Sequence, residues 1–191
     1  MLYSPLRYPG GKGKLAPFMG LMINKMNIKN GTYIEPFAGG AGVALMLLME
    51  GYVDNIVIND YDKAIYSVWR AIIEEPENLV DRILYTPVNM NEWKKQKNIY
   101  LEQNRKYSLD LAFATFFLNR TNRSGILKGG PIGGFEQKGN YSIDARYNVE
   151  KLVERIRAIA KYKKNIKVYN KEIVSFIKNV LPKYNQNSLT Y

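Results

Sequence analysis

The sequence contains no cysteine and no histidine among its 191 residues. The absence of cysteine excludes disulfide bridges, thiol nucleophiles and thiolate metal ligands. The absence of histidine excludes imidazole as a catalytic base, and with it a serine triad and most zinc sites. We therefore expect no metal centre. A chain without cysteine is also typical of the reducing cytoplasm, where we expect this protein to act.

Long apolar runs are lacking as well. The longest run, around residues 44–49, is far too short to cross a membrane. Proline and basic residues within the first twenty positions interrupt any signal-peptide core. We expect no membrane partner. A length of 191 residues, 46% of them hydrophobic, suits one globular domain with a small insertion.

Negative charge is scarce in the second half of the chain. Residues 1–90 carry 8 Lys+Arg and 9 Asp+Glu, a net charge of −1. Residues 91–191 carry 20 and 8, a net charge of +12. Such an excess predicts a polyanionic partner such as DNA or RNA. The alternative is a generally basic protein with no nucleic-acid function.

Alternating strand and helix patterns predict an α/β fold with a parallel sheet. The predicted strands are 32–34, 55–59, 166–169 and 188–191, and the predicted helices are 43–50, 61–73, 75–84, 91–104, 108–119, 149–160 and 173–181. Six glycines between residues 124 and 144 predict a loop. We divide the chain into a sheet domain, 1–74 and 146–191, and a helical insertion with a glycine-rich loop, 75–145.

A glycine cluster at residues 35–42 lies between the first predicted strand and the first predicted helix. Glycines there let the backbone approach a ligand, and a helix start offers free N–H groups. The cluster is not a phosphate loop, because no Gly-Lys-Ser/Thr follows it. Asp60, after the next strand, is placed to bind a ribose. Its alternative role is to cap the following helix.

Two basic clusters flank this pattern. Residues 7–14 contain Arg7, Lys12 and Lys14 with three glycines, and they could bind an anion or form a flexible cationic terminus. Residues 119–128 contain two arginines, two asparagines and a lysine at the edge of the glycine-rich loop. Arginine and asparagine pair with guanine and adenine edges. The alternative for this second cluster is a solvated helix end.

Together these segments resemble the DNA adenine methylase family (Dam-type, D12 class) of N6-adenine methyltransferases. The resemblance rests on Arg-Tyr-Pro-Gly-Gly-Lys at 7–12, Tyr-Ile-Glu-Pro-Phe-Ala-Gly-Gly-Ala-Gly at 33–42, Val-Ile-Asn-Asp at 57–60 and Phe-Phe-Leu-Asn-Arg-Thr-Asn-Arg-Ser-Gly at 116–125. Their order and spacing agree along nearly the whole chain. The resemblance implies a Rossmann-like methyltransferase sheet, S-adenosylmethionine as the cofactor, and an adenine in double-stranded DNA as the methyl acceptor. It also implies that the sheet domain binds the cofactor and that the insertion, 75–145, recognises DNA.

The resemblance also implies roles for individual residues. At the cofactor it places Tyr8, Lys12, Glu35, Pro36, Phe37, Gly39, Gly40, Asp60, Glu172 and Ile173. At DNA it places Arg7, Lys14, Asn119, Arg120, Asn122, Arg123, Ser124, Ile126, Lys128 and Lys138. Asp60 would bind the ribose hydroxyls. Glu172-Ile173 stands where the family usually has Asp-Phe.

The family's catalytic Asp-Pro-Pro-Tyr tetrapeptide occurs nowhere in the 191 residues. In the family this tetrapeptide ends the fourth strand, where it accepts hydrogen bonds from the target amine and stacks on the flipped base. Here the fourth predicted strand reaches Tyr191, where the sequence stops. We therefore expect a C-terminally incomplete sheet and a truncated methyltransferase that is inactive alone. A second polypeptide could supply the missing part.

Two alternative functions remain open at this stage. The chain could be a non-catalytic remnant of the family that binds DNA or S-adenosylmethionine. It could also be a nicotinamide-dependent oxidoreductase, since such enzymes share a glycine loop and an acidic residue one strand later. Against the latter, Leu45 stands at the third glycine position counted from Gly40, and the second half is strongly basic.

Overall fold

The computed structural model describes residues 3–10, 12–102, 107–184 and 187–191, and the side chains of Lys12 and Lys14 lie outside the described part. Within these residues, four strands form one parallel sheet in the order β3-β2-β1-β4. The strands are β1 (Thr32–Glu35), β2 (Asn55–Asn59), β3 (Ile166–Tyr169) and β4 (Ser188–Thr190). The predicted α/β class with a parallel sheet is confirmed.

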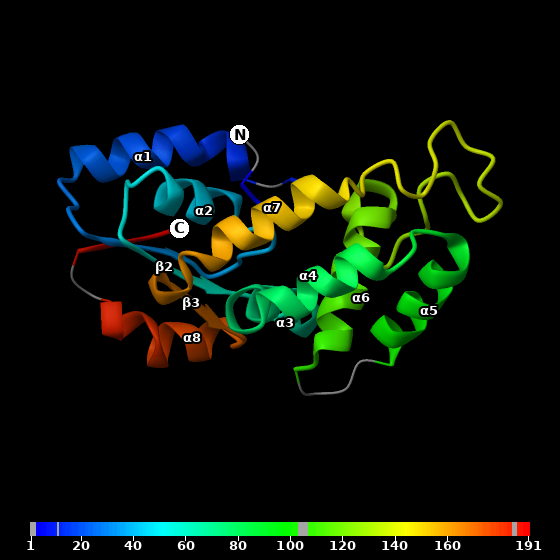
Figure 1. Ribbon diagram of the computed structural model, residues 1–191. Coiled ribbons are helices and arrows are strands. Elements are labelled where there is room, and N and C mark those ends of the chain that lie inside the picture. Colours follow the sequence, from blue (N-terminus) through cyan, green and yellow to red (C-terminus); the bar gives the residue numbers. More distant parts are fainter. Residues whose placement is uncertain (1–2, 11, 103–106, 185–186) are drawn as a thin grey trace.

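Helices cover both faces of the sheet. They are α1 (Ala16–Lys25), α2 (Gly42–Met49), α3 (Lys63–Glu74), α4 (Pro76–Tyr85), α5 (Met90–Leu101), α6 (Leu109–Thr121), α7 (Val149–Ala160) and α8 (Ile173–Asn179). Figure 1 shows α1 and α2 on one face and α8 on the other. The strands alternate accordingly: Tyr33 and Ile56 belong to the core with α2 and α3, whereas Ile34 and Val57 pack with Phe176 of α8.

Helix α1 had no counterpart among the predicted elements. Pro17, near its start, and Gly20, in its middle, are residues that usually argue against a helix. Proline is tolerated in a first turn, where its missing N–H has no partner anyway. Gly20 is required by packing, because a Cβ there would lie 2.8 Å from the ring of Tyr52. Tertiary contact therefore overrides local propensity at both positions.

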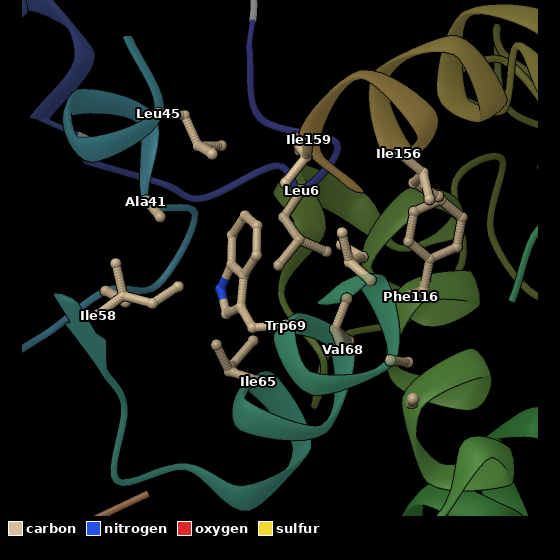
Figure 2. Packing of buried hydrophobic residues seen from close by; sticks show 14 of the residues in the cluster. Leu6, Ala41, Leu45, Ile58, Ile65, Val68, Trp69, Phe116, Ile156 and Ile159 are labelled. Atoms are coloured by element: carbon tan, nitrogen blue, oxygen red, sulfur yellow. The ribbon is translucent and has the colours of Figure 1, made fainter. Parts of the chain in front are cut away.

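One continuous hydrophobic core joins the sheet to the helices of residues 75–145. Figure 2 shows Trp69 of α3 at its centre, with Leu6 and Ile159 on one side and Ile58 on the other. Phe116 of α6 lies in the same cluster. Helix α6 packs against both α3 and α5, so residues 75–145 are joined directly to a helix that packs on the sheet. None of the described helices is long and apolar enough to span a membrane.

Candidate functional site

A cavity of about 530 Å³ opens where β1 ends and α2 begins. It is lined by Ser4, Leu6, Arg7, Tyr8, Pro9, Gly10, Gly13, Glu35, Phe37, Ala38, Gly39, Gly40, Ala41, Gly42, Asp60, Arg120 and Arg155. In open parallel sheets, ligands bind beyond the carboxyl ends of the strands, where the strand order switches direction. Here that switch lies at β1, which has β2 on one side and β4 on the other.

Three residues contact the glycine turn at Gly39: Asp60, Trp69 and Tyr8. Gly39 has φ +47°, a conformation that glycine adopts without strain. Its N–H donates to a carboxylate oxygen of Asp60 at 2.8 Å, and its carbonyl accepts from the Trp69 indole at 2.9 Å. A Cβ at this position would lie 2.9 Å from the ring of Tyr8. Only glycine therefore lets Tyr8 lie flat against the turn.

Asp60 and Asp62 have different partners. The second oxygen of Asp60 accepts from the Asp62 N–H at 2.9 Å. Asp62 is the N-cap of α3 and accepts from the Ala64 N–H at 2.8 Å. The capping role that was the alternative for Asp60 thus belongs to Asp62. Burial raises the pKa of the Asp60 carboxyl, and the hydrogen bonds from Gly39 and Asp62 offset only part of that rise.

Three arginines form part of the cavity wall. Arg7, Arg120 and Arg155 all line it. Arg120 donates to the main-chain carbonyl of Arg146 at 2.8 Å. Burial, with the charges of Arg7 and Arg155 next, lowers the pKa of Arg120 to about 10. Burial also lowers the pKa of Arg7. The wall therefore concentrates positive charge beside the glycine turn and suits an anionic group.

A second cavity of about 390 Å³ adjoins the first. Its lining residues are Tyr8, Pro9, Asp62, Ile65, Tyr100, Asn119, Gly125, Ile126, Leu127 and Lys128. Tyr8 and Pro9 line both cavities. The segment that closes the first cavity is thus also a wall of the second.

The loop after α6 presents several of the residues expected at DNA. Arg123, Ser124, Ile126 and Lys128 are exposed, and Ser124 has φ +54° at the turn. Farther along the loop, Lys138 is exposed and pairs with Glu136 at 2.6 Å. Figure 1 shows the yellow part of this loop at the end of the molecule away from the sheet.

Two asparagines expected at DNA are buried instead. Asn119 and Asn122 are 1% and 0% exposed. The Asn119 amide bonds the main chain of Arg7 and Gly125. The Asn122 amide donates to three loop carbonyls and accepts from the Trp93 indole at 2.7 Å. With these partners neither side chain is free to reach a base. Both side chains hold the backbone that carries the exposed residues.

Three further residues expected at the cofactor are not in the lining of the first cavity: Glu172, Ile173 and Pro36. Glu172 is exposed and caps α8, accepting from the N–H groups of Val174 and Ser175. Ile173 is the first residue of that helix. Pro36 is buried, and its carbonyl accepts from the Asn59 amide at 3.0 Å. Lys12, expected at the cofactor, and Lys14, expected at DNA, lie in a short 3₁₀ helix, but their side chains are outside the part that the structure describes.

Sequence reasoning missed Ser4, Leu6 and Arg155 in the cavity wall. Arg155 lies in α7, more than a hundred residues along the chain from the glycine turn. No local pattern separates it from the other basic residues of α7. Leu6 stands between Pro5 and Arg7, and no pattern in the sequence marks it as part of a cavity. Among the described residues, no group of three or more histidine, cysteine, aspartate or glutamate side chains could hold a metal ion.

Comparison with known proteins agrees with this arrangement. The family model described as D12 class N6 adenine-specific DNA methyltransferase matches residues 8–183. The match includes the glycine turn, Asp60, the insertion and the loop after α6. A search of curated proteins found no match. Because the family model covers most of the sequence, the chain belongs to the D12 class of N6 adenine-specific DNA methyltransferases.

Proposed function

We propose that this chain binds S-adenosylmethionine in the first cavity and double-stranded DNA along the loop after α6. It would thereby serve methyl transfer to N6 of an adenine. The observation that carries the proposal is the half-buried Asp60 carboxylate, which accepts from the Gly39 N–H and lines a cavity of about 530 Å³. Sites for small molecules commonly have volumes of roughly 300–1,000 Å³.

The residues of the cavity fit the cofactor chemically. Each Asp60 oxygen accepts one backbone N–H. A carboxylate has about four acceptor positions, so it can also accept from ribose hydroxyls. The arginine wall, with Arg7 and Arg155, suits the carboxylate of the methionine part.

Aromatic rings complete the fit. The side chains of Phe37 and Tyr8 are 62% and 51% exposed although both line the cavity. Rings left open in this way can cover a flat base or a cationic group. When bound, S-adenosylmethionine supplies an electrophilic methyl group on a positively charged sulfur. The chain's own residues bind and orient it.

The DNA interface that we propose consists of the exposed residues Arg123, Ser124, Ile126 and Lys128, next to the second cavity. Lys128 and Ile126 line that cavity as well as lying at the surface. The net charge of +12 over residues 91–191 would attract phosphates before any base is read.

The acceptor of the amine protons is not among the residues that we can assign. No Asp-Pro-Pro-Tyr occurs in the 191 residues. We propose that this polypeptide binds cofactor and DNA but needs the tetrapeptide from other residues, on a longer form of the chain or on a second polypeptide. A remnant that only binds is the second candidate, and the same absence favours it.

Calorimetry with S-adenosylmethionine tests the proposal directly. We expect saturable binding to one site, and no comparable binding of NAD⁺ or NADP⁺. A mobility-shift assay with adenine-containing duplexes tests the DNA part. Binding of nicotinamide cofactors alone would replace the proposal with the oxidoreductase. Binding of neither class would remove the cavity as a cofactor site.

A further inference from the structure

The cofactor cavity and the DNA-recognition loop meet at one short segment, residues 6–9. Leu6 fixes the start of this segment in the core, where Figure 2 shows it beside Trp69 and Ile159. Tyr8 and Pro9 follow and form part of both cavities. A shift of this segment would therefore change the shape of both sites at once.

Asn119 binds this segment and the loop with a single amide group. Its Oδ1 accepts from the Arg7 N–H at 2.7 Å, and its Nδ2 donates to the Arg7 carbonyl at 2.7 Å. The same Nδ2 donates to the Gly125 carbonyl at 3.1 Å. The side chain is 1% exposed. In such a site a lost hydrogen bond is not replaced by water.

Gly125 of the loop also lies close to Arg7. Gly125 has φ +77°, and a Cβ there would lie 2.6 Å from the Arg7 carbonyl oxygen and 2.9 Å from its Cβ. The Arg7 guanidinium also donates to the Asn122 carbonyl at 3.2 Å. The main chain at Arg7 thus lies close to the main chain of the loop, and the Asn119 side chain bonds both.

We propose that Asn119 is a positioning residue that couples cofactor binding to DNA binding. Asn119 lines the second cavity, but it is 1% exposed and its amide is bonded to main chain, so we expect it to act through Arg7 and Gly125. It holds Arg7 and Gly125 at one spacing, so that ordering Tyr8 against a bound cofactor also orders Gly125 and the recognition loop after it. This inference rests on the proposed function, because it needs both ligands to bind.

The inference has a thermodynamic signature. If the cofactor tightens DNA binding by some factor, DNA must tighten cofactor binding by the same factor. We expect this factor to be about tenfold in the wild type, within the usual range for coupled sites. It is measured as the ratio of the DNA dissociation constants without and with saturating S-adenosylhomocysteine, using a duplex that the wild type selects from a random pool.

Asn119→Asp tests the link with little change of shape. The Oδ1 position still accepts from Arg7, but an oxygen replaces the donor that faces the Arg7 and Gly125 carbonyls. We expect the coupling factor to fall to about one. Asn122→Asp is the matched control, because the Asn122 amide bonds the loop and Trp93 but not Arg7. It should weaken DNA binding with and without cofactor and keep the factor.

A second pair of variants tests the inference independently in case Asn119→Asp does not fold. Gly125→Ala adds a Cβ that would push the loop away from Arg7, so this variant should also abolish the coupling. Gly134→Ala introduces similar backbone strain at φ +79°, but its Cβ meets only the Arg123 side chain, at 3.7 Å. It should leave the coupling factor unchanged. Circular dichroism and thermal unfolding show which variants are folded.

The possible outcomes separate this inference from the proposed function. If the wild type binds cofactor and DNA with a coupling factor near one, the inference fails and the proposed function stands. If the folded Asn119→Asp and Gly125→Ala variants keep the wild-type factor, Asn119 has only a structural role. If the wild type fails to bind one of the two ligands, the proposed function fails and the inference fails with it.

Discussion

Two aspartates separated by one residue illustrate how position decides the task of a carboxylate. Asp60 accepts from the glycine turn, whereas Asp62 caps α3. We predict that Asp60→Ala weakens S-adenosylmethionine binding by about 1–3 kcal/mol, because buried ribose hydroxyls lose a charged acceptor. Calorimetry on the folded variant measures the loss. Unchanged affinity would remove Asp60 from the cofactor site.

Asp62→Ala is the matched control for that prediction. It removes the helix cap and should lower the free energy of unfolding by about 1 kcal/mol. Its carboxylate does not line the first cavity, so cofactor affinity should stay near the wild-type value. Thermal unfolding and calorimetry on both variants therefore separate a stability effect from a binding effect.

The pKa of Asp60 predicts a pH dependence. Because burial raises this pKa, Asp60 takes up a proton at a higher pH than an exposed aspartate does. Cofactor affinity should then fall as the pH falls through the raised pKa. The same shift means that the native state binds the proton more tightly than the unfolded state, so this protonation stabilises the fold.

Calorimetry between neutral and acidic pH, with circular dichroism at each pH, checks this prediction. In Asp60→Asn the pH dependence should be lost while the affinity stays low throughout. An Asp60→Asn variant that keeps the wild-type pH profile would assign the dependence to another group.

The turn between β1 and α2 is the element on which the first cavity depends. We predict that Gly39→Ala disrupts cofactor binding, because φ is +47° and the new Cβ would meet Tyr8 at 2.9 Å. Gly51→Ala is the control, since φ is +75° there and its Cβ meets nothing within 4 Å. Both variants should lose about 1–2 kcal/mol of stability. Only Gly39→Ala should lose cofactor affinity, which calorimetry measures.

The loop after α6 is the element that should read DNA. Affinity for duplex DNA should fall steeply with salt, because bound phosphates release counterions. We predict that Arg123→Ala and Lys128→Ala weaken binding more on the selected duplex than on random DNA. Lys138→Ala is the control, because its exposed charge already pairs with Glu136. Fluorescence anisotropy across a salt series gives these affinities, and equal losses on both DNAs would indicate phosphate contacts only.

The elements were predictable where a pattern was local. The four strands and the helices after residue 42 follow from apolar periodicity and from glycine, and the structure places them close to the predicted bounds. Helix α1 was not predictable in this way, because Pro17 and Gly20 suit it for tertiary reasons. Asn119 and Asn122 were predicted at DNA because asparagine can pair with adenine. A sequence does not show that a side chain is buried and already bonded.

At the scale of the whole molecule, charge and core are distributed differently. The positive charge is concentrated in the second half of the sequence, yet the main hydrophobic core contains residues from both halves. As a consequence, arginines from distant parts of the chain meet in one cavity wall. Arg7 comes from the first ten residues, Arg120 from α6 and Arg155 from α7. The sequence predicted the glycine turn and Asp60, which lie close together along the chain. It did not predict Arg155, which only the return of the chain to the sheet brings to the cavity.

The last prediction concerns the whole polypeptide. Methylation of adenine requires the flipped base to be held while a group accepts hydrogen bonds from its amine. The 191 residues contain no Asp-Pro-Pro-Tyr for that task. We therefore predict that the 191-residue chain binds S-adenosylmethionine but transfers no tritiated methyl group to adenine-containing duplexes. A polypeptide that carries Asp-Pro-Pro-Tyr, added in trans or fused, should restore transfer. Turnover by the chain alone would contradict this, and Glu35, which lines the cavity at 3% exposure, would be the first acceptor to test.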